Sequence, residues 1–326
     1  MKINQLDLFS GIGGFHLGFE RAGYKVTSYF SEIDKHAVAV YKNKFKNSNY
    51  VGSVTDVRGA DLPKIDLITF GSPCQDFSLA GKRKGMEGDR SSLILEAIRL
   101  IGECRPRVFI WENVKGTFSS NSGEDFSAII QAFANIGGYR LEWQLLNTSW
   151  FLPQNRERIY LVGYSANPSG GGVFPIASNH RKTFELQRQC VPANTILQRY
   201  YNATANGTYI GERELTPQVK QIGTKLDSNS GTQPYQQDRV YDANGIVPAL
   251  NQGKSDLIIK ESFRIRRLTP IECERLQGFP DDHTAYGNYD GEVKSMSNTQ
   301  RYKQCGNAVT VDVVEAIATK IKPLFK

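Results

Sequence analysis

The chain has 326 residues, of which 40% are apolar and 22% charged, and its formal net charge is +7. This length exceeds that of one typical compact core, so two domains are the default expectation, and the composition excludes a disordered chain. No apolar run reaches the ~18 residues of a membrane span, and the amino terminus lacks the apolar stretch of a signal peptide. We therefore expect a cytoplasmic protein with no membrane partner. The excess of lysine and arginine permits nucleic-acid binding without proving it.

The cysteines give no sign of a metal site or of a disulfide framework. They are five in number, widely scattered and without a C-x-x-C pair: Cys74, Cys104, Cys190, Cys273 and Cys305. An odd, scattered set is typical of a protein from a reducing compartment. We therefore expect no bound metal.

The first half of the chain alternates strand-like apolar runs with amphipathic helical stretches. The strand pattern covers residues 5–9, 25–30, 65–70, 108–112 and 158–164, and the helix pattern covers residues near 14–22, 33–45, 91–103 and 124–136. This alternation predicts a doubly wound, mostly parallel α/β sheet of the Rossmann type.

The amino-acid composition of the sequence changes at about Ala166. The stretch from there to about Glu261 is rich in Asn, Gln, Gly and Thr, which predicts a separate and irregular domain. A last segment begins at Arg266, where Thr269 is placed to cap a short helix begun by Pro270. The chain closes with a predicted helix over about 309–321, which we expect to pack back on the first domain.

The first strand runs directly into the glycine-rich sequence SGIGG at residues 10–14 and then into a helix pattern. Glycine lets the backbone approach a ligand at the amino terminus of a helix. Glu32 follows about 20 residues later at the end of the second strand, where an acidic side chain can bind ribose hydroxyls. The pair favours a nucleoside cofactor. Because the loop is not a complete G-x-G-x-x-G, a nicotinamide site and a plain glycine turn remain alternatives.

Two reactive side chains follow the ends of the next two strands. The third strand ends in GSPCQDFS at residues 71–78, and the fourth ends in WENV at residues 111–114. A thiolate at Cys74 is a candidate nucleophile, although an ordinary loop cysteine is the alternative. Since parallel strands end at one edge of a sheet, Cys74 and Glu112 are expected to converge on one crevice.

Six motifs in order resemble those of the DNA (cytosine-5) methyltransferases of bacterial and phage restriction-modification systems. They are DLFSGIGG at 7–14, GSPCQDFS at 71–78, ENV at 112–114, QNRER at 154–158, RLTP at 267–270 with RLQGFP at 275–280, and QCGNAV at 304–309. The resemblance implies a catalytic, S-adenosylmethionine-binding domain of residues 1–165 plus 263–326. The remaining residues, 166–262, fall where that family carries its target-recognition domain.

The resemblance implies methylation of carbon 5 of a flipped cytosine within a short duplex sequence. Cys74 would add to carbon 6, and Glu112 would protonate or hydrogen-bond ring nitrogen 3 and the exocyclic amine. Arg158 would contact the cytosine carbonyl oxygen, and Arg156 would support the loop or a phosphate. A strand-end salt bridge is the alternative for Glu112, and a solvated basic face is the alternative for the two arginines.

Contacts with the methyl donor are likewise implied by the resemblance. They are assigned to Phe9, Gly11, Gly13, Glu32, Ile33, Asp56, Val57, Leu93, Asn307 and Val309. Asp56 lies in SVTD, where the family commonly has a Gly-Asp pair. Ordinary core packing is the alternative for Ile33, Val57 and Leu93.

The predicted DNA contacts fall in two places. The sequence GKRKG at residues 81–85 reads as a basic lid with glycine hinges, and a solvated charge cluster is its alternative. Residues 236–241, QQDRVY, followed by GIVPAL at 245–250, resemble the recognition loop of the family. The residues assigned to DNA are Ser78, Lys82, Arg83, Lys84, Gln236, Gln237 and Arg239.

The expected partners follow from the same resemblance. They are double-stranded DNA and a cognate restriction endonuclease that acts on the same sequence without direct contact, and the chain itself is expected to be a monomer. Two other functions remain open, a transfer-RNA cytosine methyltransferase of the same fold and an inactive DNA-binding protein. A substantial domain between Tyr164 and Arg266 argues against the first. The presence of Cys74, Glu112 and Arg158 argues against the second.

Overall fold

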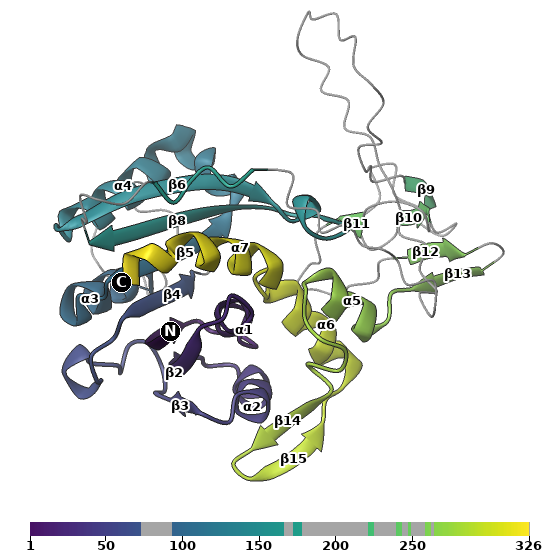
Figure 1. Ribbon diagram of the computed structural model, residues 1–326. Coiled ribbons are helices and arrows are strands. Elements are labelled where there is room, and N and C mark those ends of the chain that lie inside the picture. Colours follow the sequence, from purple (N-terminus) through teal and green to yellow (C-terminus); the bar gives the residue numbers. More distant parts are fainter. Residues whose placement is uncertain are drawn as a thin grey trace, which may run out of the picture.

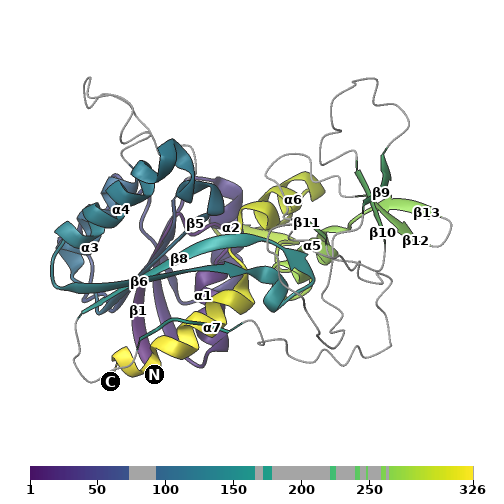
Figure 2. The ribbon, with the colours of Figure 1, turned by 90° about the horizontal axis from the view of Figure 1, so that it is seen from above.

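The computed structural model describes residues 1–72, 93–165, 172–177, 221–224, 239–242, 247–248, 258–261 and 264–325. These residues form a layered α/β body with a smaller sheet at one end (Figure 1). The amino and carboxyl ends of the chain lie close together, as Figures 1 and 2 both show.

The large sheet has seven strands in the order β3-β2-β1-β4-β5-β8-β6. Five of them are parallel to one another: β1 (Lys2–Leu8), β2 (Lys25–Ser31), β3 (Ser48–Tyr50), β4 (Leu67–Gly71) and β5 (Val108–Val114). The other two are β8 (Glu157–Ser165), antiparallel to β5, and β6 (Tyr139–Asn147), antiparallel to β8. The prediction of a doubly wound, mostly parallel sheet is confirmed. The strand order reverses between β1 and β4, and such a switch point is where open α/β sheets bind ligands.

Helices cover both faces of the large sheet (Figure 2). One face is covered by α1 (Gly14–Arg21) and α7 (Val311–Ile321), and the other by α3 (Leu93–Cys104) and α4 (Glu124–Asn135). Neighbouring strand residues alternate between the two cores, so Ile110 packs toward α7 while Trp111 packs toward α3. The remaining helix of this half is α2 (Lys35–Lys44), which follows β2.

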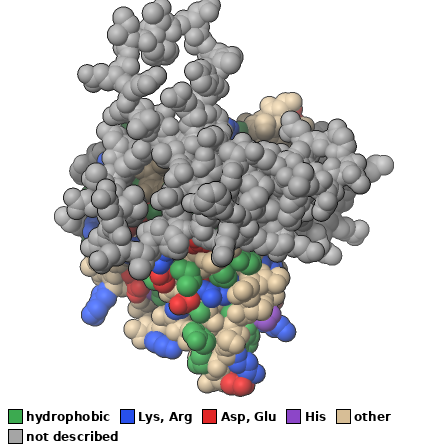
Figure 3. Space-filling view, turned by 90° about the vertical axis from the view of Figure 1, so that its right-hand side faces the viewer, with side chains coloured by type: hydrophobic (Ala, Val, Ile, Leu, Met, Phe, Trp, Pro, Cys, Tyr) green, Lys and Arg blue, Asp and Glu red, His purple; other side chains and the backbone are tan. Residues whose placement is uncertain are grey.

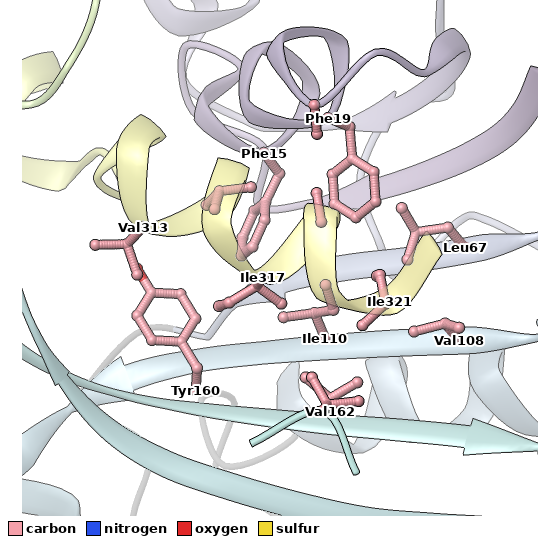
Figure 4. Packing of buried hydrophobic residues seen from close by; sticks show 14 of the residues in the cluster. Phe15, Phe19, Leu67, Val108, Ile110, Tyr160, Val162, Val313, Ile317 and Ile321 are labelled. Atoms are coloured by element: carbon pink, nitrogen blue, oxygen red, sulfur yellow. The ribbon is translucent and has the colours of Figure 1, made fainter. Parts of the chain in front are cut away.

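The carboxyl-terminal helix returns to the first helix, as expected. Figure 4 shows Phe15 of α1 and Ile317 of α7 gathered over Ile110 of the sheet. Two glycines of α1 permit this close approach, because a Cβ on Gly18 would lie 2.5 Å from Val314 Cγ1 and one on Gly14 would lie 2.6 Å from Val309 Cγ2. The carboxyl-terminal helix α7 therefore packs into the same α/β body as the amino-terminal helix α1.

The segment that precedes α7 holds a capped helix, a hairpin and a second helix. Thr269 caps α5 (Pro270–Leu276) in a reciprocal capping box with Glu272, which confirms the predicted helix start. The hairpin β14 (Tyr286–Tyr289) and β15 (Glu292–Ser295) leads into α6 (Asn298–Asn307). Short 3₁₀ turns are η1 (Gly59–Asp61), η3 (Lys115–Phe118), η4 (Ser120–Gly123), η5 (Thr148–Trp150) and η7 (Lys322–Phe325).

The smaller sheet lies in the region where an irregular domain was expected. Its order is β13-β12-β10-β9, formed by β9 (Gln221–Thr224), β10 (Arg239–Asp242), β12 (Ile258–Glu261) and β13 (Arg264–Arg267). Since β12 and β13 form an antiparallel hairpin, this sheet extends past the expected boundary at residue 263. Separately, β11 (Val247–Pro248) pairs with β7 (Gln154–Asn155), which connects this region with the QNRER segment.

Candidate functional site

The loop between β1 and α1 has a tightly constrained backbone. Phe9, Gly11 and Gly13 have positive φ values of 51°, 53° and 84°. A non-glycine residue such as Phe9 rarely adopts this region unless the surrounding structure imposes it, and such residues cluster at functional sites. A Cβ on Gly13 would lie 2.3 Å from the Phe45 ring, whereas one on Gly11 would meet no atom of the described residues within 4 Å. The loop therefore packs on α2 at Gly13 and faces open space at Gly11.

Glu32 joins this loop to the start of α2. Its Oε2 accepts a hydrogen bond from the Gly11 amide at 2.9 Å, and its Oε1 accepts from the amides of Ile33 and Asp34 at 2.8 and 2.9 Å. The carboxylate is thus held at the carboxyl edge of the sheet. The adjacent Ile33 side chain is 81% exposed, the largest exposed fraction among the exposed large apolar side chains of the described residues. The structure therefore brings together three of the predicted donor contacts, Gly11, Glu32 and Ile33.

The start of α2 is also tied to the carboxyl-terminal segment. Lys303 of α6 contacts Asp34 Oδ2 at 2.7 Å, and Tyr289 of β14 lies 2.6 Å from Nδ1 of His36. Burial raises the pKa of Asp34, but the bond from Lys303 and the backbone amides outweigh it and hold that pKa below its usual value. The residues that follow Glu32 are therefore held in place by α6 and β14 of the carboxyl-terminal segment.

The remaining predicted donor contacts lie around the same edge. Val57 is buried and Leu93 is half-buried, and both pack in the core between the sheet and α3. Asp56 is exposed beside Val57, in a turn closed by its amide on the Ser53 carbonyl. Asn307 is exposed at the end of α6, and Val309 is half-buried against α1. This arrangement of Val57 and Leu93 fits both roles considered for them, core packing and contact with the donor.

Glu112 and Arg158 meet at the end of β5. Arg158 Nε lies 3.1 Å from Glu112 Oε1, and both side chains are mostly buried. The antiparallel register of β5 and β8 brings these residues together, since Val114 is opposite Arg158. The other oxygen, Glu112 Oε2, lies only 2.9 Å from where a Cβ on Gly71 would be. The carboxylate therefore lies over the end of β4, three residues before Cys74.

The start of the cysteine loop is fixed by β5. Both Asn113 Nδ2 and Trp111 Nε1 donate to Ser72 Oγ at 3.0 Å. Asn113 Oδ1 in turn accepts from the Val114 amide and from Thr117. This network gives a physical reason for the asparagine of the ENV motif, because it holds the chain two residues before Cys74.

Not all of the predicted site residues lie within the described ranges. Those that lie outside the described residues are Cys74, Ser78, Lys82, Arg83, Lys84, Gln236 and Gln237. Arg239 begins β10, of which the backbone alone is described. Their assignments stay predictions.

Arg156 is directed into the protein. It is 4% exposed, and its Nη2 donates to the carbonyl oxygen of Ala308 at 3.1 Å. Its backbone amide donates to Asn147 Oδ1. These contacts tie the QNRER segment to the residue that follows Asn307. They favour the loop-supporting role expected of Arg156 over contact with a phosphate.

Asp7 is a buried carboxyl beneath the site whose role the sequence reasoning did not address. It is fully buried, and the hydroxyls of Thr69 and Tyr41 donate to its two oxygens at 2.7 and 3.4 Å. Burial raises the pKa of Asp7 to about 8, so at neutral pH its proton is mostly retained. Gln5 and His16 extend this polar chain through Thr69 and Tyr41. A lone acidic residue in an apolar strand was the signal that could have identified it.

Figure 3 shows acidic, basic and apolar side chains intermixed on the described part of the face that carries α6 and the β14–β15 hairpin. Several lysines in and around these elements are paired. The pairs are Lys42 with Asp290, Lys294 with Glu292, and Lys303 with Asp34. The net positive charge of the chain is therefore not concentrated in these elements.

The described part of the chain holds neither a candidate membrane span nor a candidate metal site. None of its helices is long and apolar enough to cross a membrane. No group of three or more His, Cys, Asp or Glu side chains is placed there to hold a metal ion.

Comparisons with known proteins agree on one family. The model of the family described as C-5 cytosine-specific DNA methylase matches residues 3–323. The chain is 32% identical to type II methyltransferase M.Bsp6I of Bacillus sp. (strain RFL6), over 96% of each protein. It is 34% identical to type II methyltransferase M.NgoBI of Neisseria gonorrhoeae, over 98% of this chain and 93% of that protein. Among solved structures, S. pombe Dnmt2 methyltransferase aligns over 99% of both chains with a TM-score of 0.68 and 19% identity.

Proposed function

This chain belongs to the family of C-5 cytosine-specific DNA methylases, and we propose that it transfers a methyl group from S-adenosylmethionine to carbon 5 of a flipped cytosine in a specific short duplex sequence. The observation that carries this proposal is the Glu112–Arg158 pair, with Nε and Oε1 3.1 Å apart, at the base of the Cys74 loop. Cytosine activation requires a carboxyl acid and a cation that binds the cytosine ring, together with a nucleophile, for which Cys74 is the candidate.

The described residues fit an S-adenosylmethionine molecule. The open space at Gly11, the fixed carboxylate of Glu32 and the exposed Ile33 offer room, a ribose acceptor and an apolar wall. When bound there, the donor supplies a methyl group activated by a sulfonium. Asp56, Val57 and Leu93 would hold its adenine, while Asn307 and Val309 would close the site from the carboxyl-terminal segment.

Cys74 supplies the nucleophile in this mechanism. Carbon 5 of cytosine is a poor nucleophile, so the Cys74 thiolate adds to carbon 6 and the ring becomes an enamine. Carbon 5 would then take up the methyl group as the bond from that group to the donor sulfur breaks, and the electron pair of that bond would stay on the sulfur. Transfer of the carbon 5 proton to water would then free the C–H electron pair to restore the ring double bond, and the Cys74 sulfur would leave as a thiolate. Covalent catalysis thus divides one difficult step into easier ones.

Glu112 and Arg158 stabilise the ring while it carries the adduct. Addition at carbon 6 increases electron density at ring nitrogen 3, where the Glu112 carboxyl is proposed to supply a proton or a hydrogen bond. Arg158 Nε and Nη1 bind Glu112 and the Glu157 carbonyl, and Nη2 carries two more N–H groups suited to the cytosine carbonyl oxygen. Arg156 acts on this site through the Ala308 carbonyl and so as a positioning residue.

The target sequence would be selected by residues 166–262, while residues 1–165 and 263–326 perform the chemistry. β13 continues the smaller sheet to Arg267, so its end would serve as the connection between the two domains. Gln236, Gln237 and Arg239 are proposed to read base edges. Ser78 and the basic residues Lys82, Arg83 and Lys84 would contact the duplex as the cysteine loop closes.

We further propose that the protein works as a monomer on double-stranded DNA in the cytoplasm of a bacterial or phage-infected cell. The names of the relatives, type II methyltransferases from bacteria, support this setting. A restriction endonuclease that reads the same sequence would then be its functional partner without direct contact.

The proposal predicts a defined product. Incubated with labelled S-adenosylmethionine and a duplex DNA library, the protein should incorporate label, and mass spectrometry of the nucleosides should find 5-methylcytosine. A transfer-RNA pool is the matched comparison and should stay unlabelled. Label in the RNA alone would favour the transfer-RNA alternative, and no 5-methylcytosine in either substrate would contradict the proposal.

Replacing Glu32 tests the donor site. Glu32→Ala should weaken donor binding by roughly 1–3 kcal/mol, because the proposed charge-assisted hydrogen bond to the ribose is lost. The substitution also releases the Gly11 amide from its hydrogen bond with Glu32. The donor affinity of Glu32→Gln, which keeps one acceptor oxygen, should lie between that of the wild type and that of Glu32→Ala. Calorimetric titration with S-adenosylmethionine measures the effect, and Glu292→Ala on the β15 strand is the control. Unchanged donor affinity in Glu32→Ala would remove this residue from the site.

A further inference from the structure

The loop of residues 53–59 carries two of the proposed adenine contacts, Asp56 and Val57. Val54 and Val57 are buried in the core that α3 shares with the sheet. Beyond them, residues of the loop and residues Arg99 and Glu103 of α3 together line an open pocket of about 620 Å³. Apolar packing therefore anchors the first part of this loop, and polar contacts span the rest.

Arg99 makes most of these polar contacts. Its Nη2 donates to the Val57 carbonyl at 2.9 Å and lies 3.4 Å from the Val54 carbonyl. The same guanidinium is held by two acidic residues of its own helix. Nε and Nη2 bind Glu96 at 2.9 and 2.7 Å, and Nη1 binds Glu103 at 2.7 Å. Each nitrogen of the fork is thus engaged, so its direction toward the loop is fixed.

Glu103 completes the connection from the acceptor side. Its Oε2 accepts the Gly59 amide at 2.7 Å, and this bond together with Arg99 holds the pKa of Glu103 below its usual value. A Cβ on Gly59 would lie 2.7 Å from Glu103 Cβ, so the chain approaches the helix closely at this point. The Arg99–Glu103 ion pair therefore binds the Val57 carbonyl and the Gly59 amide, which lie on the two sides of Arg58 just after Asp56.

We propose that Arg99 is a positioning residue for the methyl donor, because it sets the place of the Asp56–Val57 loop relative to Leu93. Leu93 begins the helix that carries Arg99, so the helix supplies one proposed wall of the adenine site and holds the other. This inference rests on the proposed function. It deepens that proposal by assigning donor affinity to a residue outside direct contact with the donor.

Lysine cannot replace this side chain. Its ammonium is a point charge with three donors, whereas the contacts here need a planar fork that binds Glu96, Glu103 and a carbonyl at once. Arg99→Lys keeps the charge and removes the geometry. A comparison of Arg99→Lys with Arg99→Ala therefore distinguishes an effect of loop alignment from an effect of the positive charge alone.

The test compares donor binding and turnover in the full chain. Arg99→Ala and Arg99→Lys should both raise the Kd for S-adenosylmethionine and the donor KM by about tenfold, equal to ~1.4 kcal/mol. The kcat at saturating donor should stay within about twofold, because the catalytic groups are untouched. Hydrogen exchange of the Gly59 amide should accelerate. Arg105→Ala is the control, since Arg105 binds the carbonyls of Gly102, Ile136 and Gly137 and none in this loop.

Each outcome decides between the hypotheses. Wild-type donor affinity in both Arg99 variants would overturn this inference, as would a fall in kcat at unchanged donor KM. A wild-type protein that binds no S-adenosylmethionine would overturn the proposed function and this inference with it. If Arg99→Ala does not fold, Arg99→Lys and Glu103→Gln carry the same comparison, and matching loss of affinity in Arg105→Ala would indicate general destabilisation instead.

Discussion

Cys74→Ser is expected to abolish methyl transfer, with kcat falling by roughly three orders of magnitude or more. A serine hydroxyl is a far weaker nucleophile than a thiolate, so carbon 6 would not be attacked and carbon 5 would stay unreactive. Donor binding should be unchanged, since Gly11 and Glu32 follow the ends of other strands, β1 and β2. Steady-state kinetics on methylatable duplex DNA measures the loss. Turnover at even a tenth of the wild-type rate would exclude Cys74 as the nucleophile.

A trapping experiment tests the same residue without relying on loss of activity. On duplex DNA that carries 5-fluorocytosine at the target, the wild type should form a complex that survives denaturation, because fluorine cannot leave as a proton does. Cys74→Ser should form none. Cys104→Ser is the matched control and should trap DNA like the wild type, since Cys104 lies at the end of α3 away from the crevice. If no complex forms with the wild type, a carbon-6 adduct is excluded.

Glu112→Gln has the second largest expected effect. The substitution keeps the shape of the side chain but removes the charge that pairs with Arg158 at 3.1 Å and the carboxyl proposed to act on ring nitrogen 3. General acid catalysis of this kind contributes about 10²–10⁴-fold, and kcat should fall by that factor while donor affinity stays unchanged. Single-turnover methylation separates the chemical step from product release.

Glu157→Gln is the matched control for this change. Glu157 lies beside Arg158 in β8, but its carboxylate pairs with Lys115 and is partly exposed. Its replacement should leave kcat within about twofold, as surface ion pairs contribute little. Equal rates in Glu112→Gln and the wild type would show that Glu112 only completes a strand-end salt bridge, the alternative considered from the sequence.

Local signals in the sequence predicted much of the parallel body of the fold. The strand expected at 25–30 is observed as Lys25–Ser31, and the helix expected near 14–22 is observed as Gly14–Arg21. Buried runs, turn glycines and the Thr269 cap depend on residues a few positions apart, so they can be read along the chain. The same holds for Gly11 and Glu32, because both follow the ends of parallel strands.

Elements with weak local signals were missed. β6 is a strand at the edge of the sheet, and Leu146 is its one buried residue, so its pattern lacks a clear period of two. The sheet of β9, β10, β12 and β13 lies in polar sequence and was expected to be irregular. The antiparallel direction of β8 also has no signal in its apolar run, which reads equally well in a parallel strand.

The sequence by itself determined the family and the doubly wound class, because the first depends on ordered short motifs and the second on the alternation of apolar and amphipathic runs along the chain. The tertiary structure alone decided which distant residues meet. It paired Arg158 with Glu112 through the register of β8, directed Arg156 to Ala308, and placed Arg99 on the loop of Val57. Such contacts join segments tens to hundreds of residues apart, so they depend on how strands and helices are stacked rather than on any local pattern.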